Sequence, residues 1–120
     1  MARTHRDLDV WQEAMSVVRE VYRLTAVFPR EEVFGLASQI RRSAVSIPSN
    51  IAEGAGRGGS REFLRFLSVA RGSLSELETQ VLIAVDLGYV PRQSELEARM
   101  KRLFAMLTGL SQHLHARAER

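Results

Sequence analysis

Apolar residues in four stretches of the chain recur at alternating spacings of three and four, the repeat that places side chains on one face of an α-helix. The longest stretch contains Phe63, Leu67, Ala70, Leu74, Leu77, Val81 and Ala84. The other three contain Ala14, Val17, Val21, Leu24 and Phe28, then Leu36, Ile40, Ala44, Ile47 and Ile51, and finally Leu96, Met100, Leu103, Leu107, Leu110 and Leu114. No stretch alternates with the period of two that a half-buried β-strand shows. These spacings predict an all-α fold.

Helix-ending residues separate the four stretches and leave only short connections between them. Pro29 follows the first stretch, "GAGRGGS" follows the second and Gly88 follows the third. We therefore predict helices over about residues 9–28, 33–55, 60–88 and 94–116. Short connections make consecutive helices antiparallel neighbours, and the heptad repeat favours packing at about 20°. The prediction is a single domain over residues 1–120, an up-down antiparallel four-helix bundle.

Pro48 interrupts the second stretch without changing its phase, because Ile47 precedes it and Ile51 returns on the same face. A proline inside a helix removes one backbone hydrogen bond and presses on the preceding turn, so we expect the second helix to bend there and not to end. Asn50 and Glu53 lie beside the bend. We expect them to form stabilising hydrogen bonds or a subunit contact, in preference to a catalytic pair.

Composition indicates a globular, non-membrane protein. The 120 residues are 45% apolar, yet no apolar run approaches the roughly 20 residues that cross a bilayer. The opening "MARTHRDLDVWQE" lacks the apolar segment of a signal peptide, so we expect a cytoplasmic protein. Cysteine is absent, which excludes disulfides, thiolate metal sites and cysteine nucleophiles.

The net charge of +3 is distributed unevenly. Between Val33 and Ser75 the only acidic residues are Glu53 and Glu62, against six arginines: Arg41, Arg42, Arg57, Arg61, Arg65 and Arg71. The planar guanidinium fork of arginine suits bidentate binding of phosphate and carboxylate. This window is therefore the candidate binding region.

Three of these arginines gather at the glycine-rich connection. Arg57 lies in "GAGRGGS", and Arg61 and Arg65 are one turn apart at the start of the next helix. Guanidiniums near the positive end of a helix can hold a phosphate backbone; alternatively, they are solvated charges paired with Glu62 and other acids. A nucleotide-binding P-loop is not indicated, because the lysine and serine or threonine of that motif are missing and the segment follows a helix.

Nothing in the chain predicts catalysis, a metal or a cofactor. His113 and His115 are two residues apart, so they do not share a helix face. Neither a Ser-His-Asp arrangement nor the inward Glu-x-x-His pattern of di-iron bundles is present. Phe63 and Phe66 occupy apolar helical positions, so stacking of bases on them is not expected.

Two segments, "SIPSNIAEGAGR" and "REFLRFLSVARGSLSELETQ", resemble the four-helix bundle proteins of the 23S rRNA intervening-sequence family, also called the S23 family. The resemblance extends over about residues 7–117. It implies a bacterial, cytoplasmic bundle that assembles as a ring, typically a homopentamer. It also implies that the family motif serves architecture and assembly; the matching residues are Pro48, Ser49, Asn50, Glu53, Gly54 and Arg57.

Two functions remain open at this point. One is a ring that binds RNA through phosphate contacts of Arg57, Arg61 and Arg65, joined by Arg41, Arg42 and Arg71 if they face the same rim. The other is a protein-interaction scaffold or accessory subunit. A related branch of the family consists of basic pentamers that engage the reverse transcriptase of diversity-generating retroelements, which makes such a partner one possible case.

Overall fold

The computed structural model describes residues 4–118 and places four α-helices in that range. They are α1 (Asp9–Thr25), α2 (Leu36–Gly56), α3 (Ser60–Asp86) and α4 (Ser94–Ala118). Two short 3-10 helices, η1 (His5–Asp7) and η2 (Arg30–Glu32), precede α1 and α2. No strand occurs within residues 4–118. The all-α four-helix prediction is confirmed.

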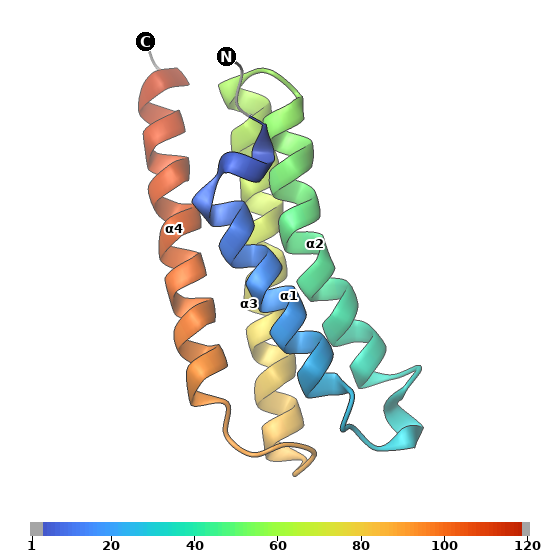
Figure 1. Ribbon diagram of the computed structural model, residues 1–120. Helices are drawn as coiled ribbons and strands as arrows, with labels where there is room; N and C mark the ends of the chain where they lie inside the picture. The colour runs from blue at the N-terminus through green and yellow to red at the C-terminus, as the bar shows by residue number, and fades with distance from the viewer. Residues whose placement is uncertain (1–3, 119–120) are drawn as a thin grey trace.

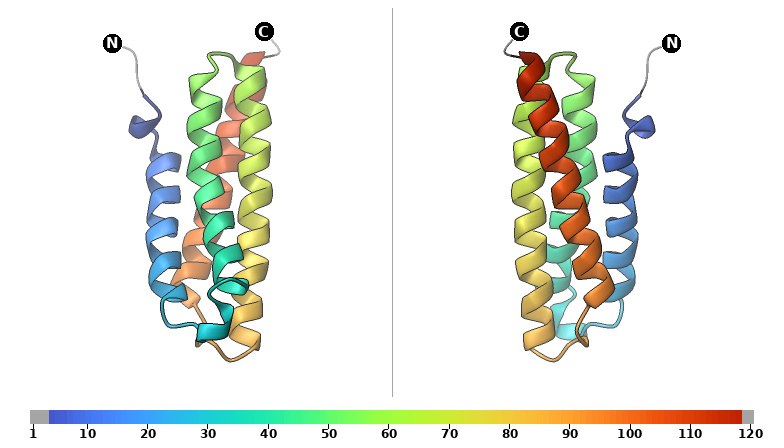
Figure 2. Two further views of the ribbon diagram at one scale, coloured as in Figure 1. Left: turned by 90° about the vertical axis from the view of Figure 1, so that its right-hand side faces the viewer. Right: turned by 90° about the vertical axis from the view of Figure 1, so that its left-hand side faces the viewer.

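The helices run alternately up and down and lie side by side in an elongated bundle of 50 × 21 × 20 Å (Figures 1 and 2). The turn between α2 and α3 lies at the same end of the bundle as the beginning of α1 and the end of α4 (Figure 1). The α1–α2 and α3–α4 connections lie together at the opposite end.

One hydrophobic core runs along the bundle, and the apolar repeats supply it. Fully buried side chains come from all four helices and include Val17, Ile47, Leu67, Leu77 and Leu103. The exposed fraction of each of these side chains is zero. Burial of this kind contributes roughly 1.5–3 kcal/mol per large side chain before the entropy cost of folding is counted.

The first helix ends earlier, and the second begins later, than the sequence indicated. Helix α1 stops at Thr25, and α2 starts at Leu36 after the 3-10 helix that follows Pro29. The carboxylate of Glu32 explains the later start. Its Oε1 accepts the Leu36 backbone N–H at 2.9 Å, and its Oε2 accepts the Tyr89 hydroxyl at 2.7 Å. Glu32 thus joins the start of α2 to the α3–α4 connection.

Gly88 ends α3 as predicted from its place after the apolar stretch. Its φ of +78° lies in the left-handed region that glycine adopts without strain. The Gly88 N–H donates to the Val85 carbonyl at 3.0 Å, and the Tyr89 N–H donates to the Ala84 carbonyl at 3.0 Å. These two bonds form a Schellman motif, which places Tyr89 where it reaches Glu32.

Helix α2 continues through Pro48, which is buried within it. The predicted bend at this residue stays a prediction. Asn50 forms the hydrogen bonds expected beside the proline, because its Nδ2 donates to the Ser46 carbonyl at 2.7 Å and to Ser46 Oγ at 2.9 Å. Ser46 Oγ in turn lies 2.8 Å from Ser73 Oγ on α3. The motif therefore ties α2 both to itself and to its neighbour.

Gly54 lets α2 and α3 approach each other closely near their common turn. A Cβ added at Gly54 would lie 2.8 Å from the Cβ of Phe66 and 3.0 Å from Cδ1 of Phe63. Real Cβ atoms do not approach so closely, so only glycine fits without a shift of one helix. This contact brings Phe66 next to the end of α2.

Candidate functional site

The α2–α3 turn positions the three arginines that the sequence grouped together. Arg57 caps the C-terminus of α2, and Gly58 follows it with a φ of +83°. Helix α3 then begins at Ser60 with Gly59 as its N-cap. Arg61 and Arg65 project from the first two turns of α3, so all three lie at one end of the bundle. We call Arg57, Arg61 and Arg65 the arginine cluster.

Phe66 lies beside this cluster and contacts two of its members. The guanidinium carbon of Arg65 lies 4.6 Å from the centre of the Phe66 ring, and that of Arg57 lies 5.3 Å from the same centre. Both distances fall within the range of cation–π attraction, about 6 Å. The half-buried ring therefore holds two arginines from different helices near each other.

Two carboxylates accompany the cluster. Arg65 Nε donates to Glu62 Oε2 at 2.9 Å, and Arg57 Nε lies 3.6 Å from Glu53 Oε2. All four side chains are about half exposed. Exposed pairs of this kind contribute at most about 1 kcal/mol and weaken as salt rises. Arg61 is exposed and makes no ion pair or hydrogen bond among residues 4–118.

The arrangement can bind anions at the end of the bundle. A phosphate oxygen can replace a carboxylate oxygen in an exposed pair, because guanidinium binds either group through the same fork. Arg61 can bind a phosphate oxygen without first releasing a carboxylate of the described residues. The positive end of the α3 dipole also favours an anion at this position.

The remaining predicted arginines lie away from the cluster. Arg41 contacts α1, where its Nε donates to Thr25 Oγ1 at 2.7 Å and its guanidinium carbon lies 4.7 Å from the centre of the Tyr22 ring. Arg71 faces α4. Arg41 precedes the end of α2 by 15 residues, or about 22 Å of helix rise. Within one subunit, the six arginines are therefore not a continuous band.

Arg42 is exposed and lies beside a small polar cavity between α2 and α3. In that cavity Ser43 Oγ donates to Glu76 Oε1 at 2.8 Å. Arg42 is thus separated from the arginine cluster by the Ser46–Ser73 contact and the turns beyond it. It precedes Arg57 by 15 residues, about 22 Å of helix rise, and so lies outside the arginine cluster.

Sequence reasoning missed the role of Phe66. The sequence placed it only among the apolar helical positions of α3, and its neighbour Arg65 was treated as a separate charge. The contact with Arg57 depends on how the turn returns α3 against α2, and no local pattern reports that. The small residue at Gly54 was the available signal, because it indicates a close helix contact at this point.

The part of the chain between residues 4 and 118 contains no group of three or more His, Asp or Glu side chains that could hold a metal ion. Over the same residues, no helix combines the length and apolar character that a membrane crossing needs.

The family model described as "23S rRNA-intervening sequence protein" matches residues 6–109. The chain belongs to this family. The match includes α1, α2 and α3 with the whole arginine cluster, and it ends inside α4. No curated protein matches the chain. The resemblance found in the sequence is therefore confirmed at the level of the 23S rRNA-intervening sequence family.

Proposed function

We propose that the chain is a non-enzymatic RNA-binding protein whose arginine cluster contacts the phosphate backbone. The observation that carries the proposal is the contact of Arg57 and Arg65 with one Phe66 ring. Arg61, which has no ion-pair partner within residues 4–118, lies beside them. The family description, which refers to 23S rRNA, is consistent with an RNA-associated role.

Phe66 contributes by orienting the arginines. Ordering a flexible arginine costs side-chain entropy on binding, and a partner that already restricts the guanidinium reduces that cost. Bases can also stack on guanidinium planes as they do on aromatic rings. The cluster is therefore suited to backbone contacts with unpaired nucleotides and carries no pattern of base-reading side chains.

We propose further that the chain forms a closed ring, the pentamer implied by the family resemblance. A groove of about 580 Å³ between α1 and α2 has apolar walls from Tyr22, Val33, Phe34 and Val45 and charged walls from Arg41 and Arg42. Phe34 is 97% exposed. We assign this groove to a second copy of the chain.

The complementary surface lies at the end of α3. Leu82, Ile83 and Leu87 are exposed apolar residues there, and the exposed Asp86 lies among them. An apolar surface with an acid fits an apolar groove with two arginines, and contact between different faces of identical copies produces rings. A ring repeats the arginine cluster around one rim, which raises avidity without tight individual sites.

Under the alternative function, a scaffold or accessory subunit, the same groove would dock another protein such as a reverse transcriptase. Light scattering tests the assignment to a second copy. Phe34→Ser should dissociate the assembly, and so should Arg42→Glu, whereas adding Asp86→Arg to Arg42→Glu should restore it. A wild-type monomer, or a ring indifferent to all three variants, would contradict the assignment and favour a different partner for the groove.

Fluorescence anisotropy with labelled single-stranded RNA tests the RNA proposal. The variant Arg57→Gln/Arg61→Gln/Arg65→Gln should lose at least about tenfold in affinity, because each charge-assisted bond contributes about 1.5–3 kcal/mol. Arg19→Gln/Arg23→Gln/Arg102→Gln removes the same charge from exposed positions on α1 and α4 and should retain most of the affinity. Equal losses in both variants, or no binding by the wild type, would overturn the proposal.

A further inference from the structure

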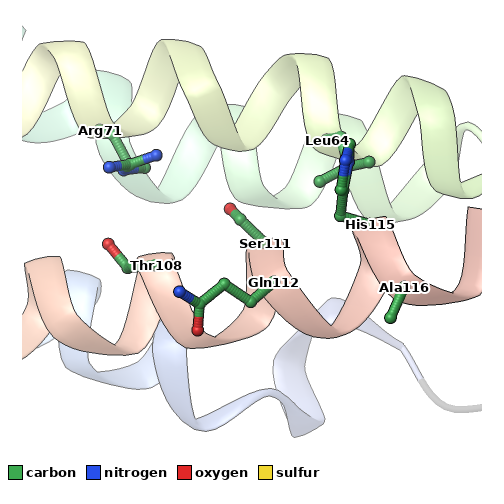
Figure 3. Close-up of a pocket in the computed structure, with 7 residues that line it drawn as sticks. All are labelled: Leu64, Arg71, Thr108, Ser111, Gln112, His115 and Ala116. Carbon is green, nitrogen blue, oxygen red and sulfur yellow. The ribbon is translucent and has the colours of Figure 1, made fainter.

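A cleft opens between α3 and α4, separate from the arginine cluster. Its volume is about 500 Å³. It is lined by Leu64 and Arg71 from α3 and by Thr108, Ser111, Gln112, His115 and Ala116 from α4 (Figure 3). Small-molecule sites usually have volumes of about 300–1,000 Å³. The cleft is thus large enough for a small ligand.

Two polar atoms in this cleft are buried without hydrogen-bond partners in the described part of the chain. They are Arg71 Nε and Thr108 Oγ1. The side chains of Arg71 and Thr108 extend toward each other from the two facing helices (Figure 3). Leaving a buried donor unpaired is unfavourable, so both atoms have donor capacity that an acceptor in the cleft could use.

Arg71 lacks a carboxylate partner within residues 4–118. Its guanidinium carbon lies 5.0 Å from the centre of the Phe104 ring, and it takes part in no ion pair there. A half-buried cation without a counterion attracts an anion into its cavity. No Asp or Glu lines the cleft to compete with that anion.

The lining restricts the chemistry of the ligand. A carboxylate matches the planar fork of Arg71 and can also accept from the Thr108 hydroxyl. Leu64 and Ala116 provide apolar surface in the cleft. The Phe104 ring contacts Arg71 from outside the cleft lining. The polar groups therefore suit the acid group, and the apolar groups suit the body of the ligand.

We propose that the α3–α4 cleft binds a small organic acid that consists of a carboxylate and an apolar body. Arg71 holds the carboxylate, with Thr108 as a second donor. This assigns Arg71 to a ligand site and removes it from the RNA-contacting set. Ser111 and Gln112 lie beyond residue 109, where the family match ends, so part of the cleft is not covered by that match.

Nuclear magnetic resonance of the ¹⁵N-labelled full chain tests this site directly. Benzoate serves as the amphipathic probe, acetate as a carboxylate without an apolar body, and inorganic phosphate as another oxyanion, all at constant ionic strength. We expect benzoate to shift the Arg71 Nε–H signal and the Thr108 amide saturably. Acetate and phosphate should bind at least about tenfold more weakly.

Two variants separate the site from general charge effects. Arg71→Gln should abolish the saturable shift at Thr108. Arg102→Gln should preserve it, because Arg102 is exposed about 120° around α4 from Thr108 and does not line the cleft. If Arg71→Gln does not give a folded spectrum, Thr108→Val provides the second test and should weaken benzoate binding.

Linear, unsaturable shifts with benzoate would overturn the proposal, as would an unchanged benzoate response in Arg71→Gln. Equal affinities for phosphate and benzoate would overturn the assignment to an amphipathic acid. The RNA-binding variants do not alter Arg71, so failure here leaves the function proposed for the arginine cluster unaffected.

Discussion

Gly54 of α2 and Phe66 of α3 meet where a Cβ on the glycine would lie only 2.8 Å from the Cβ of the phenylalanine. The same phenylalanine contacts Arg57 and Arg65 through its ring. A glycine in the middle of the family motif therefore determines where the proposed RNA-binding arginines gather. This contact therefore links the packing of the bundle to the proposed RNA-binding cluster.

Gly54→Ala should destabilise the fold. The added methyl would lie 2.8 Å from the Phe66 Cβ and 3.3 Å from the Phe63 Cα, so a helix must shift, at a cost of about 1–3 kcal/mol. The midpoint of urea unfolding, monitored by circular dichroism, measures the loss. Gly72→Ala is the control: nothing lies within 4 Å of its added Cβ, and it should gain about 0.5–1 kcal/mol. Equal stability of the two variants would show that α2 and α3 are not in tight contact at Gly54.

Glu62→Gln should raise the affinity for single-stranded RNA. The substitution removes the carboxylate that holds Arg65 at 2.9 Å and raises the net charge near the cluster by one. Glu20→Gln makes the same charge change beside Arg23 on α1 and is the matched control. Anisotropy titrations should show tighter binding for Glu62→Gln alone. A similar gain in the control would mean that net charge, and not the cluster, governs affinity.

The hydrogen bonds of Glu32 predict that part of the folding stability is lost at acid pH. The Leu36 backbone N–H, followed by the Tyr89 hydroxyl, lowers the pKa of the Glu32 carboxyl by hydrogen bonding. A lowered folded-state pKa contributes stability above the unfolded-state value, about 4.3, and this contribution is lost as pH falls through the folded-state pKa. Glu32→Gln should therefore flatten the acid side of the curve of unfolding free energy against pH.

The stability that Tyr89 contributes depends on pH in the opposite direction to that of Glu32. The hydrogen bond to Glu32, more than burial, raises the pKa of the Tyr89 phenol. Its contribution is complete below about pH 10 and is lost as pH rises through the raised pKa. Tyr89→Phe should flatten the alkaline side of the same stability curve. The control Glu95→Gln, at an exposed residue of α4, should change neither the acid nor the alkaline side. If the stability curves of Glu32→Gln and Tyr89→Phe matched that of the wild type at both acid and alkaline pH, this role for the Glu32–Tyr89 bond would be contradicted.

The sequence was sufficient to predict the helices because each one buries a continuous apolar stripe. It was less informative about their ends: Phe28 fits the apolar repeat of α1, yet it is buried in the connection beyond Thr25. Glu32 decides where α2 starts through a bond to Tyr89, which is 57 residues away in the chain. Contacts between distant segments cannot be read from local spacing.

For the candidate site, too, the sequence predicted what depends on nearness in the chain and not what depends on contacts between helices. The clustering of Arg57, Arg61 and Arg65 follows from their nearness in the chain across one turn. The separation of Arg41 and Arg71 depends on which neighbouring helix each one faces, and charge counting along the sequence treated them alike. Three-dimensional packing therefore places the arginines of one basic window in separate regions of the bundle.

The salt dependence of RNA binding tests the central claim most directly. The logarithm of the wild-type association constant should fall linearly with the logarithm of salt concentration, because phosphate contacts release counterions. Arg65→Gln should reduce that slope by about one unit, and Arg102→Gln should leave it unchanged. A wild-type affinity that is insensitive to salt, or identical slopes for Arg65→Gln and the wild type, would contradict a phosphate-binding role for the cluster.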